Sequence, residues 1–467
     1  MWKLIGTVFC IILIIVIVVF EARRPKKNIN NRFDLLSGIN VIYVFCYGII
    51  PICLLNLDFS MLSNHILDSL DMEKENFLFA SVLSIIGYVS ILVGYYYKNI
   101  VCKLTRKPIK YNDSLYNQSK SYNVSKFSMV VFTILIFAIG SVSLIQYVNN
   151  LGGFSQAIRV AEVLRMYTDT NKFSNPYAVM LMPLIIASCT MFYVLNKLEH
   201  SLLAKIIYQA MFIVTFTMSI YYYLLNAGRL PLFIFLSSFI ILGYIMKEKK
   251  SIKANLSIII VVLLGVFILQ NLDDLFSYLA FDTVNKEDVS ALDKFKKNIL
   301  EFSFPYVNLV KVHSFTYPDG TFRYFVDYFT WLVNIIPTSI LNVFGADKVM
   351  SSHLLNTANY NLVNIAGIPV DLVSLGYYQF SVPGVVITCS LFGVIATSVE
   401  DFLQKFTHPA FMLIKIRIMY LCIFCVMYAD PDVIARGRLD VTIIILFLVL
   451  FSRVSSNKEK NGKFIKR

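Results

Sequence analysis

Charged residues are scarce in this chain. They account for only 15% of the 467 residues, while hydrophobic residues account for 57%. In soluble globular domains about a quarter of the residues are charged, and these keep the surface in water. The composition therefore excludes a soluble globular protein and is typical of a protein that crosses a membrane several times.

The sequence also lacks the motifs that bind metals and nucleotides. It has no His-Glu-x-x-His motif, no glycine-rich phosphate loop, and no Asp-x-Asp motif in any loop that we assign below to the cytoplasm. Eight cysteines are present, but none lies in the polar segment 271–369, so we expect no disulfide framework. Cys422 and Cys425 have C-x-x-C spacing on an apolar helix, where we interpret them as packing residues. We expect no metal, nucleotide or other cofactor.

Long hydrophobic runs are abundant instead. A helix needs about 20 apolar residues to cross the hydrocarbon core of a bilayer, and about eleven segments meet that length. We therefore predict an all-α polytopic membrane protein of about 11 transmembrane helices, forming a single integral membrane domain over residues 1–467. The predicted spans cover residues 4–20, 35–55, 77–97, 127–148, 176–195, 203–225, 230–246, 254–270, 378–399, 411–428 and 433–454.

Lysine and arginine residues crowd alternate loops between these spans. They gather at residues 23–32, 98–126, 247–253 and 453–467. Because cytoplasmic loops of membrane proteins are enriched in positive charge, we assign these loops to the cytoplasm. The N-terminus then lies outside and the C-terminus inside, and the net charge of +13 reflects topology rather than a nucleic-acid partner. Segment 271–369, between spans 8 and 9, becomes a large extracytoplasmic loop.

Two other outer segments carry arginines. After Gly152 and Gly153, apolar residues recur at helical spacing, as in an interfacial helix, and this helix carries Arg159 and Arg165. Arg229 lies in a tight turn at a helix N-terminus, and that combination suits an anion such as phosphate. Snorkelling toward lipid headgroups is the alternative for the first pair, and helix capping is the alternative for Arg229.

The large outer loop combines aromatic and polar side chains. Such a mixture suits a sugar-binding cleft, because sugars offer C–H faces for stacking and hydroxyls for hydrogen bonds. His313, Asp319 and His353 are its candidate acid–base residues, and Arg323 is a candidate anion ligand. A loop packed on headgroups has the same composition, and we expect residues 328–341 to be interfacial or re-entrant.

A charged cluster lies at the outer end of the last two predicted spans. It forms either a self-neutralising ion network or part of a substrate site, and the sequence leaves both open. Lys415 and Arg417 lie within a predicted span, from which we expect their side chains to reach the cytoplasmic edge. The cluster comprises Asp430, Asp432, Arg436, Arg438 and Asp440.

The order of these features resembles the oligosaccharide repeat-unit polymerases, the Wzy-type polymerases of bacterial surface polysaccharides. The resemblance covers most of the chain and consists of its organisation and short local motifs. Relatives of this type often have an acidic residue and a glycine where this chain has Leu375 and Ser381. The motifs here are Gly152-Gly153 with its arginines, Gly228-Arg229, Tyr317-Pro318-Asp319-Gly320, Ile336-Pro337, Gly367-Ile368-Pro369 and Tyr377-Tyr378-Gln379-Phe380-Ser381-Val382-Pro383-Gly384.

The resemblance implies a glycosyltransferase that needs neither metal nor nucleotide, with a glycosyltransferase C-like fold. A growing glycan on polyprenyl pyrophosphate is transferred to a hydroxyl of a new lipid-linked repeat unit at the outer face of the bacterial cytoplasmic membrane. Arginines stabilise the leaving pyrophosphate, and a base takes the hydroxyl proton. The implied substrate ligands are Arg159, Arg165, Arg229, Arg323, Arg436 and Arg438, and the implied catalytic candidates are His313, His353 and Asp319.

The partners implied by the resemblance are lipids and proteins of one pathway. They are the polyprenyl pyrophosphate-linked oligosaccharide, membrane lipids, a flippase and a chain-length regulator. Two other functions stay open. A lipid-linked oligosaccharide flippase or other transporter needs charged residues in the middle of its spans. An O-antigen-type ligase, which transfers finished glycan to another acceptor, shares nearly all the features above.

Overall fold

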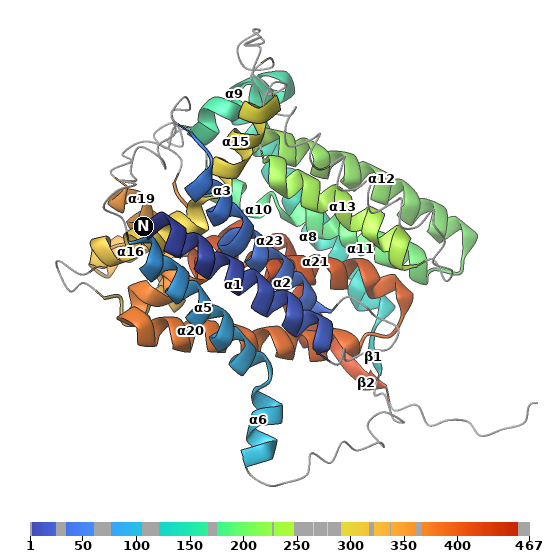
Figure 1. Ribbon diagram of the computed structural model, residues 1–467. Coiled ribbons are helices and arrows are strands. Elements are labelled where there is room, and N and C mark those ends of the chain that lie inside the picture. The colour runs from blue at the N-terminus through green and yellow to red at the C-terminus, as the bar shows by residue number, and fades with distance from the viewer. Residues whose placement is uncertain are drawn as a thin grey trace, which may run out of the picture.

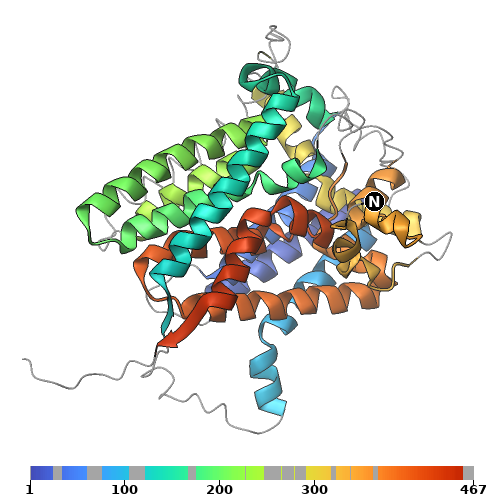
Figure 2. The same cartoon turned by 180° about the vertical axis from the view of Figure 1, so that it is seen from behind.

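The computed structural model of the chain consists almost entirely of helices (Figure 1, Figure 2). Two short paired strands are the only β-structure in the described ranges. The structure describes residues 2–24, 34–59, 76–104, 121–166, 175–226, 228–246, 265, 278, 291–316, 322–336, 338–360 and 367–455.

Seven helices in these ranges are long and apolar enough to cross a membrane. The chain is therefore a multi-pass membrane protein, as its composition predicts. Two shorter apolar helices, Arg229–Ile245 and Leu439–Phe451, accompany the seven. The seven are Lys3–Arg23, Leu35–Asn56, Phe77–Tyr95, Lys126–Asn150, Pro176–Leu198, Leu202–Leu225 and Leu372–Gln404.

The first hydrophobic core joins helices from distant parts of the sequence. One of them, α16 (Phe304–Thr316), comes from the segment predicted to be an outer loop. Its Tyr306 is fully buried, and the Tyr306 hydroxyl lies 2.9 Å from Ser81 Oγ. The loop therefore contributes a helix to the interior of the bundle. Other elements of this core include α1 (Trp2–Arg23), α2 (Leu35–Val44), the π-helix η1 (Phe45–Ile49), α3 (Ile50–Asn56), α5 (Phe77–Tyr95), the end of α15 (Ala291–Glu301), α20 (Leu372–Gln404) and the end of α21 (Met412–Phe424).

A second core packs against the last third of α20. A hairpin of α12 (Leu202–Leu225) and α13 (Arg229–Ile245) extends from this half of the bundle in both views. Phe235 of α13 is buried against α11 and α12 in a separate small cluster. The second core is built from α8 (Lys126–Asn150), α11 (Leu184–Leu198), the 3-10 turn η4 (Pro409–Phe411), α21 (Met412–Phe424) and α23 (Leu439–Phe451).

The two ends of the bundle differ. At one, which we call the strand end, β1 (Ser121–Val124) pairs antiparallel with β2 (Ser452–Ser455), and α6 (Tyr97–Leu104) follows α5. The opposite end, the loop end, carries the short connecting helices (Figure 1). These are α9 (Phe154–Met166), α10 (Pro176–Leu181), α15 (Ala291–Glu301), η3 (Val326–Tyr328), α17 (Thr330–Asn334), α18 (Thr338–Val343), α19 (Ser352–Asn359) and α22 (Pro431–Gly437).

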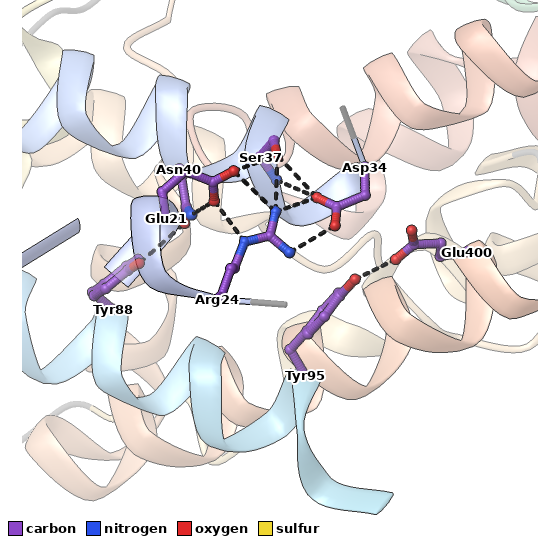
Figure 3. A network of polar contacts seen from close by, with 8 residues as sticks. All are labelled: Glu21, Arg24, Asp34, Ser37, Asn40, Tyr88, Tyr95 and Glu400. Atoms are coloured by element: carbon purple, nitrogen blue, oxygen red, sulfur yellow. Dashed lines mark hydrogen bonds and ion pairs between the residues drawn. The ribbon is translucent and has the colours of Figure 1, made fainter. Parts of the chain in front are cut away.

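A buried arginine ties α1 to α2 at the strand end. The Arg24 guanidinium lies between the carboxylates of Glu21 and Asp34 and also donates to Ser37 Oγ at 2.8 Å (Figure 3). Burial opposes ionisation of Asp34, but hydrogen bonds from Arg24 and Ser37 outweigh it and lower the pKa of that carboxyl. The stability that Asp34 contributes is therefore present above its unfolded pKa and is lost as the pH falls through the lowered folded pKa.

Helices α5 and α20 cross in unusually close contact. A Cβ atom built on Gly94 would lie 1.9 Å from the carbonyl oxygen of Ser390, and one built on Gly393 would lie 2.3 Å from that of Ile91. No other residue fits such a distance, so glycine on both helices lets the two backbones touch. This crossing joins the first core to the long helix that also serves the second.

Two predicted spans turn out differently, and a third is not tested. Segment 433–454 is not one helix, because the chain leaves helical geometry at Arg438 (φ −118°, ψ 34°) and separates α22 from α23. Segment 411–428 is helical only over α21, which ends at Phe424. Segment 254–270 lies outside the described residues except for Gly265. The break at Arg438 lets Arg436 stay at the loop end while Asp440 enters the bundle.

We predict that Gly94→Val separates α5 from α20. The added side chain must displace the backbone of Ser390, so the free energy of unfolding should fall by about 1–3 kcal/mol or more. The measurement is the thermal midpoint of the purified protein in detergent. Gly243→Ala is the control, because a Cβ there meets nothing within 4 Å. Equal midpoints for the two variants would contradict the close crossing.

Candidate functional site

Helix α20 is broken near the loop end. Pro383 has no backbone N–H, so the carbonyl of Gln379 cannot receive the usual hydrogen bond from four residues ahead. Phe380 (φ −164°, ψ 47°) and Ser381 (φ 57°, ψ −146°) depart from helical geometry at the same point. Positive φ with extended ψ is nearly restricted to glycine, so Ser381 stores strain of about 1–3 kcal/mol.

Residues from the segment predicted to be an outer loop occupy this break. The N–H of Arg323 donates to the carbonyl of Tyr378 at 2.9 Å, and the N–H of Tyr324 donates to the carbonyl of Gln379 at 3.0 Å. At this position Tyr324 and the adjacent Phe325 adopt left-handed backbone conformations, with φ values of 45° and 66°. The loop therefore supplies the donors that Pro383 and the departure from helical geometry remove.

A buried carboxylate locks the loop onto α20. Asp327 is fully buried, and its Oδ1 accepts hydrogen bonds from Arg323 Nη2 at 2.6 Å and Nε at 3.1 Å. Its Oδ2 accepts from Gln379 Nε2 at 2.7 Å. Arg323 also donates to the carbonyl of Met350. The guanidinium of Arg323 is thus engaged in holding the loop.

Three aromatic rings gather beside the break. The ring centroids of Phe322, Tyr324 and Phe380 lie 6.1 to 6.4 Å apart. Tyr324 is 63% exposed and Phe380 is 45% exposed. Exposed rings on a rigid support suit the C–H faces of a sugar.

A buried polar network supports the neighbouring α19. Asp371, the N-cap of α20, accepts from the Tyr47 hydroxyl at 2.6 Å and from Asn308 Nδ2 at 3.2 Å. Asn356 Nδ2 donates to Asn308 Oδ1 at 3.2 Å, and the Tyr378 hydroxyl donates to Asn356 Oδ1 at 2.7 Å. These bonds connect η1, α16, α19 and α20, so the loop end is held by polar contacts as well as apolar packing.

His353 begins α19 beside the charged cluster of α22. The backbone N–H of His353 donates to Asp430 Oδ2 at 2.7 Å. Asp432 forms an ion pair with Arg436. Burial lowers the pKa of His353; the charge of Asp430 raises it and that of Arg436 lowers it, and the net direction is downward. The ring rests on Gly367, because a Cβ there would lie 2.4 Å from His353 Nε2. Arg436 and Asp432 thus follow the self-neutralising alternative.

A cavity of about 300 Å³ lies between the α12–α13 hairpin and the segment α21–α23. Its walls are mostly aromatic and aliphatic, and Gly228 places the Arg229 turn at its rim. A few polar groups converge on it, which is typical of a ligand site. They are Asn226, Arg417, Arg438, Asp440 and the hydroxyl-bearing side chains Tyr222, Tyr223, Tyr420 and Tyr428.

The wall of the cavity contains a buried ion pair. Arg417 is 8% exposed, Asp440 is 4% exposed, and Arg417 Nη2 pairs with Asp440 Oδ2. Arg417 Nε and Nη1 are buried and make no hydrogen bond of good geometry in the described part of the chain, although the Tyr223 side chain lies against the guanidinium. The guanidinium carbon lies 5.4 Å from the centroid of the Phe235 ring. The prediction that Arg417 reaches the cytoplasmic edge is wrong, because Asp440 holds it in the interior.

Buried N–H groups without partners are costly and call for a ligand or water. Because Arg417 is positively charged, a ligand that accepts hydrogen bonds from it is favoured further if it is an anion. Arg438 makes no ion pair with any described residue. Together they give the cavity a surplus of one positive charge over Asp440. The arrangement is suited to an anion with an apolar tail.

The sequence-predicted site residues are scattered. Among those described with their side chains, Arg438 alone lines the cavity. Arg229 lies at the rim and forms an ion pair with Glu301 at 2.8 Å. His313 is exposed in the last turn of α16, with its ring edge-on to Phe79 at a centroid distance of 5.4 Å.

The remaining candidates give less information. Arg159 is exposed on α9. Arg165 lies on the same helix, but its side chain is outside the described part. Asp319 lies outside the described residues. The roles assigned to these residues stay predictions.

Sequence reasoning missed the pair of Arg417 and Asp440. Each residue stands out as a charge within or beside an apolar run, and opposite charges on neighbouring spans are a signal for a buried pair. Their contact depends on how deeply α21 and α23 sit against each other, which the sequence does not state.

Comparisons of the chain with protein-family models, with curated proteins and with solved structures found no match. Function is therefore argued from the cavity and its residues.

We predict that Ser381→Gly stabilises the protein. Glycine adopts the backbone angles of Ser381 without strain, so the free energy of unfolding should rise by about 1 kcal/mol. The matched control is Ser398→Gly, which places glycine at an exposed position in the helical part of α20 and should cost about 0.5 kcal/mol. Thermal midpoints in detergent measure both. A lower midpoint for Ser381→Gly would show that the break carries no strain.

Proposed function

We propose that this chain joins lipid-linked oligosaccharide repeat units into a surface polysaccharide. The observation that carries the proposal is the apolar cavity beside Arg438, in which Arg417 presents two buried nitrogens that make no hydrogen bond of good geometry with the described residues. Apolar walls suit a lipid chain, and arginines suit a phosphate-bearing head group. A glycan on polyprenyl pyrophosphate combines both features in one substrate.

The distribution of charge supports a site on the outer face. Exposed basic residues at the strand end include Arg23, Lys98, Lys126 and Lys405. By the positive-inside rule that end faces the cytoplasm, with the N-terminus outside and the C-terminus inside. The cavity is lined by the α12–α13 turn and by α22, both at the loop end. Such a site suits a substrate delivered on a lipid.

The proposed reaction depends on placement and charge. A hydroxyl of the acceptor repeat unit attacks the anomeric carbon of the donor glycan, and the pyrophosphate leaves. Arg417 and Arg438 bind the phosphates and stabilise the charge that develops on the leaving group. The exposed rings of Tyr324 and Phe380, with the half-buried ring of Phe322 beside them, offer a stacking surface for the glycan outside the cavity.

A flippase for the same lipid-linked oligosaccharide is the second candidate. The specific observation in its favour is the ion pair of Arg417 and Asp440, because charges inside the bundle mark transport paths as well as binding sites. A ligase that transfers finished glycan to another acceptor would use the same donor and the same arginines.

Deletion of the gene separates the three functions. We expect single repeat units on lipid to accumulate in the outer leaflet, because the donor is made and flipped but not extended. The measurement is the chain length and leaflet of the lipid-linked glycans. Single units confined to the inner leaflet would identify a flippase, and finished chains on lipid would identify a ligase. Arg417→Gln should fail to restore polymer, whereas Arg453→Gln, an exposed arginine of β2, should restore it.

The role of Arg229 is tested by comparison with its partner. Arg229→Ala removes a positive charge from the rim, so we expect shorter polymer from a normally inserted protein. Glu301→Gln breaks the same ion pair but keeps the arginine, and because the Glu301 side chain is 40% exposed, the pair contributes only about 1 kcal/mol. Polymer length on gels should therefore stay normal in Glu301→Gln. Equal shortening in both variants would mean that Arg229 only holds α15 in place.

A further inference from the structure

Asp440 is the only carboxylate among the described residues that line the cavity, and no histidine is among them. It lies in the first turn of α23. Its Oδ2 accepts a hydrogen bond from Arg417, while Oδ1 receives none from any residue in the described ranges. Asp440 therefore brings to the cavity a carboxylate oxygen that is able to accept a proton.

The other proton acceptors considered from the sequence do not line the cavity. His313 is exposed on α16 against Phe79, and the ring of His353 rests on Gly367. A general base must come within hydrogen-bonding reach of the hydroxyl that it deprotonates. Among the described candidates, only Asp440 shares a cavity with the two arginines.

We propose that Asp440 is the general base of the transfer and that its ion pair with Arg417 determines when it acts; the inference rests on the proposed function. Without substrate, the guanidinium of Arg417 is the counter-ion of the Asp440 carboxylate and occupies its Oδ2. A pyrophosphate carries more negative charge than one carboxylate and attracts Arg417, whose Nε and Nη1 make no hydrogen bond of good geometry with the described residues. Asp440 then loses its counter-ion in an apolar wall, where an unpaired charge binds a proton strongly.

The step is balanced in atoms and electrons. The acceptor oxygen forms a bond to the anomeric carbon of the donor, and the bond from that carbon to the pyrophosphate oxygen breaks. The electron pair of the broken bond leaves with the pyrophosphate, which Arg417 and Arg438 hold. The proton of the acceptor hydroxyl passes to Oδ1 of Asp440. Because the donor must bind before Arg417 moves, the base becomes active only when a leaving group is in place.

The test uses the full-length protein in lipid nanodiscs and lipid-linked repeat units purified from the deletion strain. We expect Asp440→Asn to lower kcat by about 100-fold or more, the range of general-base catalysis. The inhibition constant of farnesyl pyrophosphate, a probe of the anion site, should change less than about threefold, because the arginines that bind it remain. Arg417→Gln should instead weaken inhibition by farnesyl pyrophosphate.

Asp401→Asn is the matched control, because Asp401 is a partly exposed carboxylate paired with Lys98 at the strand end and should leave kcat unchanged. Wild-type kcat in Asp440→Asn would overturn the inference and leave the polymerase standing. Loss of farnesyl pyrophosphate inhibition in Asp440→Asn would also overturn it, because Asp440 would then only position Arg417. A wild-type protein that extends no repeat units would overturn the proposed function itself.

Asp440→Asn leaves Arg417 buried without its counter-ion, which can prevent insertion. The double variant Arg417→Gln with Asp440→Asn removes both charges and provides a second test. The reference for this test is the single variant Arg417→Gln, which already lacks the arginine. At saturating substrate, a kcat in the double variant that lies about 100-fold or more below that of Arg417→Gln would support the inference, and equal kcat values in the two variants would overturn it.

Discussion

The arrangement of the loop end depends on one requirement, which is that the backbone carbonyl of Gln379 must receive a hydrogen bond. A membrane-embedded helix cannot leave a backbone carbonyl without a donor, and Pro383 takes the normal donor away. The N–H of Tyr324 replaces it, which holds the segment around Tyr324 in the break of α20. Once the loop is there, Asp327 can bond to the Gln379 side chain, so one missing N–H fixes where a whole segment lies.

Two buried arginines differ in how many of their guanidinium nitrogens are hydrogen-bonded. This difference distinguishes an arginine that holds the fold together from one that is a candidate ligand-binding residue. Arg24 at the strand end bonds through Nε, Nη1 and Nη2 to Glu21, Asp34 and Ser37, so it is complete without a ligand. Arg417 bonds through Nη2 to Asp440, whereas its Nε and Nη1 make no hydrogen bond of good geometry in the described structure. Both side chains pay the cost of leaving water, but only Arg417 still has donors to offer. That difference, rather than burial, makes the α21–α23 cavity the candidate site.

Much of the fold is predictable because apolar length and loop charge are local properties. Runs such as 4–20, 77–97 and 203–225 correspond to helices that are long and apolar enough to span. Local hydrophobicity does not predict where a helix ends, as at Arg438. It also does not predict that a polar segment packs into the interior, as α16 does. The Tyr306 hydroxyl of α16 can be buried because Ser81 Oγ and the carbonyl of Phe77, both in α5, are its hydrogen-bond partners.

The sequence by itself determined that the chain is a helical membrane protein. So many long apolar segments can be kept from water only in a lipid bilayer, where a helix satisfies its own backbone hydrogen bonds. It also marked Arg438 and the Gly228 turn, because charge and glycine at the end of an apolar run are visible in one dimension. Only the tertiary structure decided that Arg417 meets Asp440 and that Arg323 serves the loop instead of a ligand. Ion pairs depend on the depth and rotation of neighbouring helices, and those are set by contacts such as Gly94 against Ser390 that lie hundreds of residues apart.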